Sequence, residues 1–178
     1  MTLLAKDNFL FFYYSESFYR IPTFAETSNM EIKNLFDPTV KQEIIHRINT
    51  LHPDSQPQWG KMNVAQMLAH LQMPIAIAYG THQPKGSFLL RLIGPLFKSK
   101  LWDEKPWKQG LPTDPTFITV GTRKEFEQEK STLLDLINRF SESAIVGEKH
   151  PIFGKMTKEN WSKATWKHVD HHLRQFGV

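Results

Sequence analysis

Cysteine is absent from the 178 residues of this chain. That absence excludes disulfide bonds, thiolate metal sites and a cysteine nucleophile together. A metal ion in this protein must therefore be held by histidine, aspartate or glutamate side chains. A thiolate that takes part in any reaction must come from a small molecule.

Long apolar runs and blocks of like charge are also missing. No stretch approaches the roughly 20 apolar residues of a membrane-spanning helix. The aromatic stretch FLFFYY, residues 9–14, is short and precedes no convincing cleavage site, which argues against a signal peptide. The net charge of +4 is modest and acidic residues alternate with basic ones. We therefore expect a cytoplasmic protein with neither a nucleic-acid nor a membrane partner.

Length and composition predict one compact domain. Hydrophobic residues make up 40% and charged residues 22%, which is ordinary for a globular protein. Residues 1–29 lack a sustained helical period, and regular patterning begins at Met30. We interpret residues 1–29 as an N-terminal extension, with Met30 as an alternative start of the natural chain, and residues 30–178 as the folded domain. An ordered arm that covers the domain is the alternative for the extension.

Four amphipathic segments predict helices, and each follows a recognisable start signal. The first follows Asp37 and has proline at its first position, the second opens with the capping box of Asn63 and Gln66, the third follows the T-x-x-E of Thr122 and Glu125, and the last runs from Thr157 to about Gln175. Alternating strand patterns are almost absent. The expected fold is all-α, a four-helix bundle with a long connection between its second and third helices.

That connection, residues 81–121, is rich in proline and glycine and contains the basic amphipathic segment GSFLLRLIGPLFKSKLW. We expect a short helix that packs on the bundle, with Gly94 and Pro95 interrupting any long helix. Two alternatives stay open for this segment. It could touch a membrane surface, or residues 86–100 could form a basic binding module.

Three histidines fall close together in the last segment, WKHVDHHLRQFGV, residues 166–178. At about 100° per residue, one arc of this helix holds Trp161, Ala164, Thr165, His168, His172 and Phe176. His171 lies on one flank, and the opposite, solvated side is expected to carry Lys167, Asp170 and Arg174. Two buried imidazoles need partners, and their i, i+4 spacing lets both bind one metal ion. The alternative is a pair of ordinary core or helix-end residues.

A third ligand would strengthen the metal interpretation, and His70 is the best candidate. Pro74 cannot donate to the carbonyl of residue 70, so the second helix should kink there. On an ideal wheel His70 lies at the flank of the apolar stripe rather than at its centre. The reserve candidates are His82 and His150, both in predicted loops. We expect the remaining pair, His46 and His52, at the surface or at a helix end.

Resemblance to a known family rests on four segments: NLFDPTVKQEIIHRINTL, QPQWGKMNVAQMLAHLQ, RLIGPLFKSK and HPIFGKMTKENWSKATWKHVDHHLRQFGV. Together they resemble the DUF1569 family, which belongs to the DinB/YfiT-like superfamily of proposed metalloenzymes. The resemblance covers residues 30–178. It implies an up-down-down-up four-helix bundle that holds one divalent ion, zinc or nickel, through His70, His168 and His172. His171 would lie beside the ligands, where it supports them or takes part in catalysis.

The function implied by this resemblance is metal-dependent chemistry on a small molecule. Some relatives are thiol-dependent S-transferases or isomerases, so a low-molecular-weight thiol is one candidate substrate, and hydrolysis of a small molecule is another reaction. No catalytic base is identified, because Asp170 is expected to face away from the ligands and Glu159 lies two turns or more from them. The alternative is a non-catalytic bundle whose histidine or metal cluster is structural or mediates formation of a homodimer.

Overall fold

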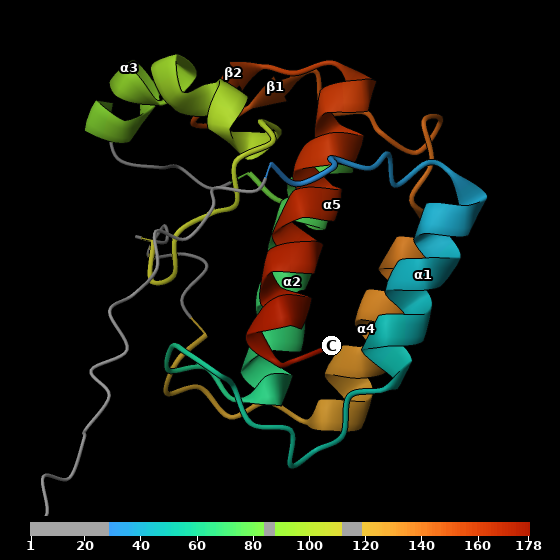
Figure 1. Ribbon diagram of the computed structural model, residues 1–178. Coiled ribbons are helices and arrows are strands. Elements are labelled where there is room, and N and C mark those ends of the chain that lie inside the picture. Colours follow the sequence, from blue (N-terminus) through green and yellow to red (C-terminus); the bar gives the residue numbers. More distant parts are fainter. Residues whose placement is uncertain (1–28, 84–87, 112–118) are drawn as a thin grey trace, which may run out of the picture.

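The computed structural model describes residues 29–83, 88–111 and 119–178, which form a mainly helical structure (Figure 1). In chain order the elements are α1 (Pro38–Asn49), α2 (Val64–Ala78), α3 (Phe88–Phe97), the 3₁₀ helix η1 (Lys98–Leu101), α4 (Phe126–Arg139), β1 (Lys149–His150), β2 (Gly154–Lys155) and α5 (Lys158–Gln175). The two short strands pair antiparallel, with His150 opposite Gly154. The predicted helical fold is confirmed, and the small hairpin adds to it. Residues 1–28 of the proposed extension, residues 1–29, lie outside the described part of the chain.

Three of the four predicted helix starts are confirmed. Asp37 accepts the N–H two residues on, at 2.7 Å, and opens α1. Asn63 and Gln66 form the reciprocal capping box that opens α2, and Thr157 accepts the N–H three residues on at the start of α5. These side chains satisfy N–H groups of the first turn that have no partner inside the helix. Local sequence therefore determines where these helices begin.

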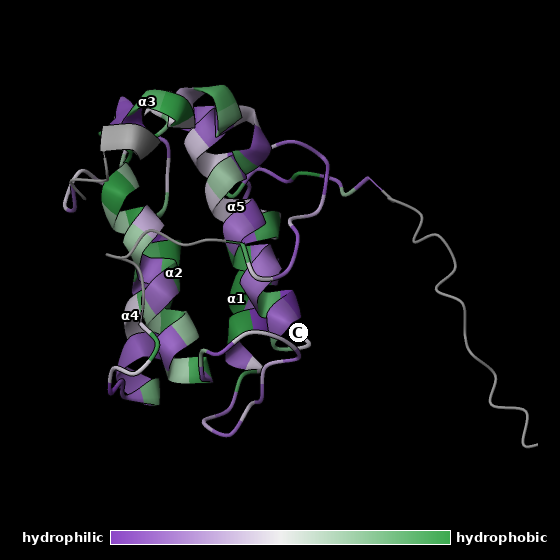
Figure 2. Ribbon diagram, turned by 90° about the vertical axis from the view of Figure 1, so that its left-hand side faces the viewer, coloured by the Kyte–Doolittle hydropathy of each residue, from purple (hydrophilic) through white to green (hydrophobic). Residues whose placement is uncertain are grey.

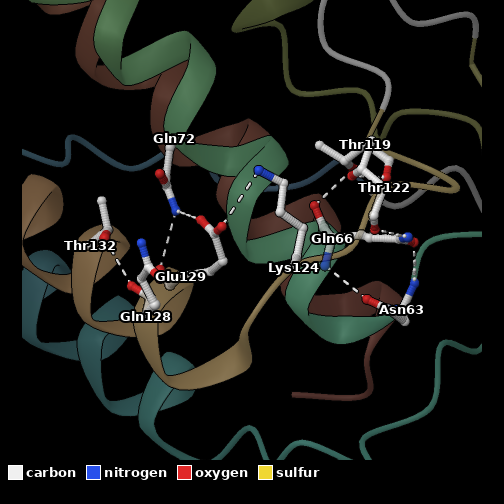
Figure 3. Close-up of polar contacts among 9 residues, drawn as sticks. All are labelled: Asn63, Gln66, Gln72, Thr119, Thr122, Lys124, Gln128, Glu129 and Thr132. Carbon is white, nitrogen blue, oxygen red and sulfur yellow. Dashed lines mark hydrogen bonds and ion pairs between the residues drawn. The ribbon is translucent and has the colours of Figure 1, made fainter.

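The predicted capping box of α4 is wrong. Glu125 occupies the N-cap position but makes no side-chain capping bond. Thr122 instead donates its hydroxyl to the carbonyl of Thr119 at 2.6 Å, and its own carbonyl accepts from the Gln66 amide at 2.9 Å (Figure 3). Thr119 in turn donates to the carbonyl of Gln66 at 2.9 Å. Bonds to the first turn of α2 have replaced the local cap.

The four longest helices pack against one another in pairs. Both α4 and α5 pack against α1 and α2. A polar contact also joins α2 to α4, since Gln72 donates to Glu129 at 2.7 Å and Lys124 lies 3.5 Å from the same carboxylate (Figure 3). The core between these helices contains fully buried side chains such as Ile44, Ile48, Met67, Leu68, Leu133, Ile137 and Leu173. This packing brings the middle of α2 beside the middle of α5.

Gly94 and Pro95 do not interrupt α3, which continues through both residues. A side chain at Gly94 could not fit, because a Cβ atom there would lie 2.5 Å from the carbonyl oxygen of Ile152. Glycine thus allows α3 to approach the β1–β2 hairpin closely, and Figure 1 shows the two side by side. The prediction of a short helix is confirmed. Within the described ranges, no helix combines the length and apolarity needed to cross a membrane.

The predicted solvated side of α5 is wrong for Lys167 and Asp170, which are only 1% and 3% exposed. Many residues of this helix are hydrophilic (Figure 2), yet charged partners surround it. Arg47 of α1 lies 2.8 Å from the Asp170 carboxylate, and Lys167 lies 2.7 Å from that of Asp103. Only Arg174 of the three is exposed, and it also pairs with Asp170. A helical wheel cannot detect such packing because it carries no information about neighbouring elements.

Candidate metal centre

His70, His168 and His172 converge, as the sequence predicts. His70 projects from α2 and the other two from α5, and all three ring centroids are nearly equidistant, at 4.8 to 4.9 Å. Each residue offers one ring nitrogen, and these atoms lie within 4.8 Å of one another. The Nε2 atoms of His70 and His168 are 3.0 Å apart. The three side chains therefore surround a common point.

This geometry fits one divalent ion. Two nitrogens bound to zinc at about 2.0–2.1 Å in tetrahedral geometry lie roughly 3.3 Å apart. The observed spacing of the His70 and His168 nitrogens, 3.0 Å, is close to that value. The three nitrogens lie within 4.8 Å of one another, so a shared ion requires small rotations of the His70 and His168 rings about χ2, a torsion with a broad energy minimum.

Apart from His171, the remaining histidines do not belong to the cluster. His46 and His52 are exposed, as predicted. His150 lines the cavity described below, but its Nδ1 accepts from the N–H groups of Ile152 and Phe153 at 3.0 and 3.3 Å. His82 is not among the described residues that line that cavity. Neither reserve candidate joins the cluster. His70 does join it, even though on an ideal helical wheel it lies at the flank of the apolar stripe.

Gln175 fixes the orientation of one ligand. The Nδ1 of His172 lies 2.7 Å from Oε1 of Gln175, and Nε2 of that amide donates to the carbonyl of Trp59 at 2.6 Å. Because the amide oxygen can only accept, Nδ1 of His172 must carry the proton in the neutral ring. The Nε2 lone pair of His172 is then available to a metal. Such a bond from the outer ring nitrogen accompanies most metal-binding histidines.

Burial keeps the two α5 ligands neutral. Burial, followed by the proximity of His172 and His70, holds the pKa of His168 well below its ordinary value of 6.5. Burial and the neighbouring His70 also lower the pKa of His172 to about 3. Both rings are therefore unprotonated at neutral pH, the state in which imidazole binds a metal.

Two tryptophan rings lie beside the cluster. Trp107 has its ring centroid 5.6 Å from those of both His168 and His171, and Trp59 lies 5.8 Å from His171. His171 thus contacts both indoles and lies next to His172, with the His171 and His172 ring centroids 5.2 Å apart. Burial lowers its pKa as well. Both indoles also line the cavity described below.

The cluster opens onto a cavity of about 1140 Å³. Its lining includes most of the arc of α5 that the sequence predicts, with Trp161, Ala164 and Thr165 beside the two histidines, whereas Phe176 of that arc is buried and does not line it. Asp103 is the only carboxylate among the described lining residues, and it is bound to Lys167 and Lys100. Glu159, considered from sequence as a base, pairs instead with Lys163 at 2.6 Å. Of the described residues, no carboxylate free of a lysine partner faces the cavity.

The comparisons with known proteins yield one match. The sequence model of a family described as a protein of unknown function, DUF1569, matches residues 30–177. The chain belongs to the DUF1569 family. No curated protein and no solved structure matches this DUF1569 chain. The family description names no reaction, so the function of this member has to be inferred from its site.

Sequence reasoning missed three contributors to the centre of this DUF1569 protein. Gln175 could have been found, because it lies three residues after His172 and therefore on the same helical face. Trp59 and Trp107 carry no such signal, since they lie in irregular segments before α2 and after η1. Only the fold brings these two rings to the histidines.

Proposed function

We propose that this protein is a divalent-metal-dependent enzyme of the DinB-like superfamily that acts on a small molecule. The observation that carries the proposal is the convergence of three histidines from two helices at the wall of a large cavity. A three-histidine site leaves coordination positions open for water or substrate, which distinguishes catalytic from structural zinc sites. Zinc and nickel are the candidate ions, since both accept imidazole ligands.

The chain's own residues have distinct tasks in this proposal. His70, His168 and His172 would hold the ion, which supplies Lewis acidity and activates a bound water or thiol. Gln175 holds the His172 ring in the tautomer that presents Nε2. Trp107 and Trp59 would form part of the cavity wall beside the cluster. His171, an imidazole beside the proposed ligands, would be the group that accepts a proton from a reacting molecule.

The proposed architecture is the DinB-like four-helix bundle with up-down-down-up order. Its support is the pairwise packing in which α4 and α5 both contact α1 and α2, with the long connection between α2 and α4. The position of the histidines also agrees with this architecture, because bundle metal sites are built from facing helices.

The reaction class follows from the donor set and the composition. Because the chain has no cysteine, a thiolate would have to enter with the substrate. We propose transfer of a low-molecular-weight thiol as the first reaction to screen, and hydrolysis of small esters or amides as the second. A metal that only stabilises the fold or joins two copies of the chain is the rival outcome.

Metal content and activity test the proposal together. Protein loaded with zinc or nickel should bind about one ion per chain, and His168→Ala should lose that ion while the exposed His46→Ala retains it. Turnover of a screened substrate should disappear with a chelator and return with metal. Absence of a stoichiometric ion in the wild-type protein would overturn the metal centre. Activity that survives complete metal removal would overturn the mechanism, and metal binding without turnover would favour the structural rival.

A further inference from the structure

The cavity next to the histidine cluster has two chemically different kinds of surface. Many of its lining residues are apolar or aromatic, and they come from separate parts of the chain. Ile93 and Phe97 lie on α3, Ile152 and Phe153 in the turn of the hairpin, and Trp161 on α5. Since α3 approaches the hairpin closely at Gly94, the residues of these two elements lie on neighbouring parts of the lining, and we call all five residues the apolar wall of the cavity. An apolar ligand body would displace water from this wall favourably.

The charged residues of the lining are almost all basic. Among the described lining residues there are four lysines, Lys61, Lys100, Lys105 and Lys108, and one aspartate, Asp103. The net charge of these five side chains is therefore +3, from four lysines and one aspartate.

The single negative charge is already compensated. Lys167 lies 2.7 Å and Lys100 3.2 Å from the oxygens of Asp103. These bonds outweigh burial, which alone would raise the pKa of Asp103, and the net result is a lowered pKa. Lys61, Lys105 and Lys108 thus have no acidic partner among the described lining residues, and the cavity has a positive electrostatic potential. A bound divalent ion would make that potential more positive.

We propose that this cavity binds an amphipathic anion, a small organic molecule with an apolar body and one carboxylate. A cavity of about 1140 Å³ is ample for such a molecule, since ligand pockets typically measure roughly 300–1,000 Å³. The carboxylate gains from the lysines and the apolar body from the wall, whereas a cationic molecule of the same shape meets repulsion. That this molecule is the substrate rests on the proposed function; the binding preference rests on the cavity alone.

Isothermal titration calorimetry with octanoate, 1-octanol and octylammonium tests the preference, because the three probes share a chain and differ in charge. In chelator-treated protein, octanoate should bind at least fivefold more tightly than octanol, and octylammonium should bind most weakly. Zinc-loaded protein should keep this order. The inference is overturned if octanol or octylammonium binds as tightly as octanoate, or if octanoate gives no saturable heat.

Lysine variants test the location. The double variant Lys61→Gln, Lys105→Gln should weaken octanoate binding several-fold and leave octanol binding unchanged, and both positions are exposed, so folding should persist. Lys158→Gln is the matched control, as Lys158 is exposed and does not line the cavity. Equal affinity of the double variant and the wild-type protein for octanoate would overturn the inference. Zinc stoichiometry, measured on the same samples before titration, separates failure of the proposed metal centre from failure of this preference.

Discussion

Gln175 is the residue whose polar contacts most directly hold one histidine of the proposed metal centre in place. Its amide oxygen lies 2.7 Å from Nδ1 of His172, and its amide nitrogen is held by the carbonyl of Trp59. The amide is therefore fixed at both ends, and only one orientation satisfies both contacts. The orientation of His172 thus depends on a residue outside the three-histidine cluster.

Replacement of this amide should weaken metal binding without removing a ligand. We expect Gln175→Leu to lower zinc affinity about 10- to 100-fold, the usual effect of losing a partner of a metal-binding histidine. Competition with a chromophoric chelator would measure it. Gln128→Leu, at an exposed position on α4, should leave the affinity unchanged. An unaltered affinity in Gln175→Leu would show that the histidine needs no such support.

Acid should destabilise the metal-free protein before its carboxylates titrate. Burial, with His70 nearby, lowers the pKa of His172 to about 3 in the folded chain, against an ordinary value of 6.5. The unfolded chain therefore binds more protons between these values, and stability falls as pH decreases below about 6.5. We expect the Tm of chelator-treated protein to fall from pH 7 to pH 5.

The control for this prediction removes the titrating rings. In the double variant His168→Ala, His172→Ala the dependence of Tm on pH should be shallower over the same interval. A wild-type Tm that stays constant between pH 7 and pH 5 would contradict the prediction.

Among the elements, η1 and the segment after it are attached to α5 through one buried side chain. The ammonium group of Lys167 donates to the carbonyls of Lys100 and Asp103 at 3.1 and 2.6 Å and to the Asp103 carboxylate at 2.7 Å. Trp107 belongs to the same segment, and its indole N–H donates to the carbonyl of Lys100 at 2.8 Å. This connection holds the Trp107 ring beside His168, the residue that follows Lys167.

Loss of that ammonium group should loosen the segment. We expect Lys167→Met to destabilise the fold by about 1–3 kcal/mol, because the buried acceptors lose their donor. Chemical denaturation would measure it. Lys163→Met, on the same helix, removes only a surface pair with Glu159 and should cost less than about 1 kcal/mol. Equal effects of the two substitutions would contradict a special role for Lys167.

The starts of α1, α2 and α5 were predictable because their signals are local, a short polar side chain followed by an apolar period. The start of α4 was not, since Thr122 and Thr119 bond to Gln66, far away in sequence. The same distinction applies to the site. His168 and His172 follow from one-helix geometry, whereas the burial of Lys167 and the approach of Trp59 and Trp107 depend on elements that a single helix cannot reveal.

At the scale of the whole molecule, a bound ion would join α2 to α5 across 98 residues of sequence. An ion that binds only the folded chain stabilises it by mass action, by about 2.7 kcal/mol at 100 times the dissociation constant. For a domain of this size we expect zinc to raise Tm by roughly 5–10 °C. Differential scanning fluorimetry would measure the shift. Chelator should reverse it, and His172→Ala should show none; an equal shift in that variant would place the stabilising ion elsewhere.

The two indoles beside the histidines have an optical consequence. Trp107 contacts the ring of His168, and Trp59 contacts that of His171 next to the cluster, so an ion held by the three histidines would lie near both fluorophores and nearer to Trp107. Nickel has a partly filled d shell and quenches a neighbouring excited indole, while zinc has a closed shell and does not. Emission from the native chain should therefore report which of the two ions is bound, and how quickly one replaces the other, without any attached label.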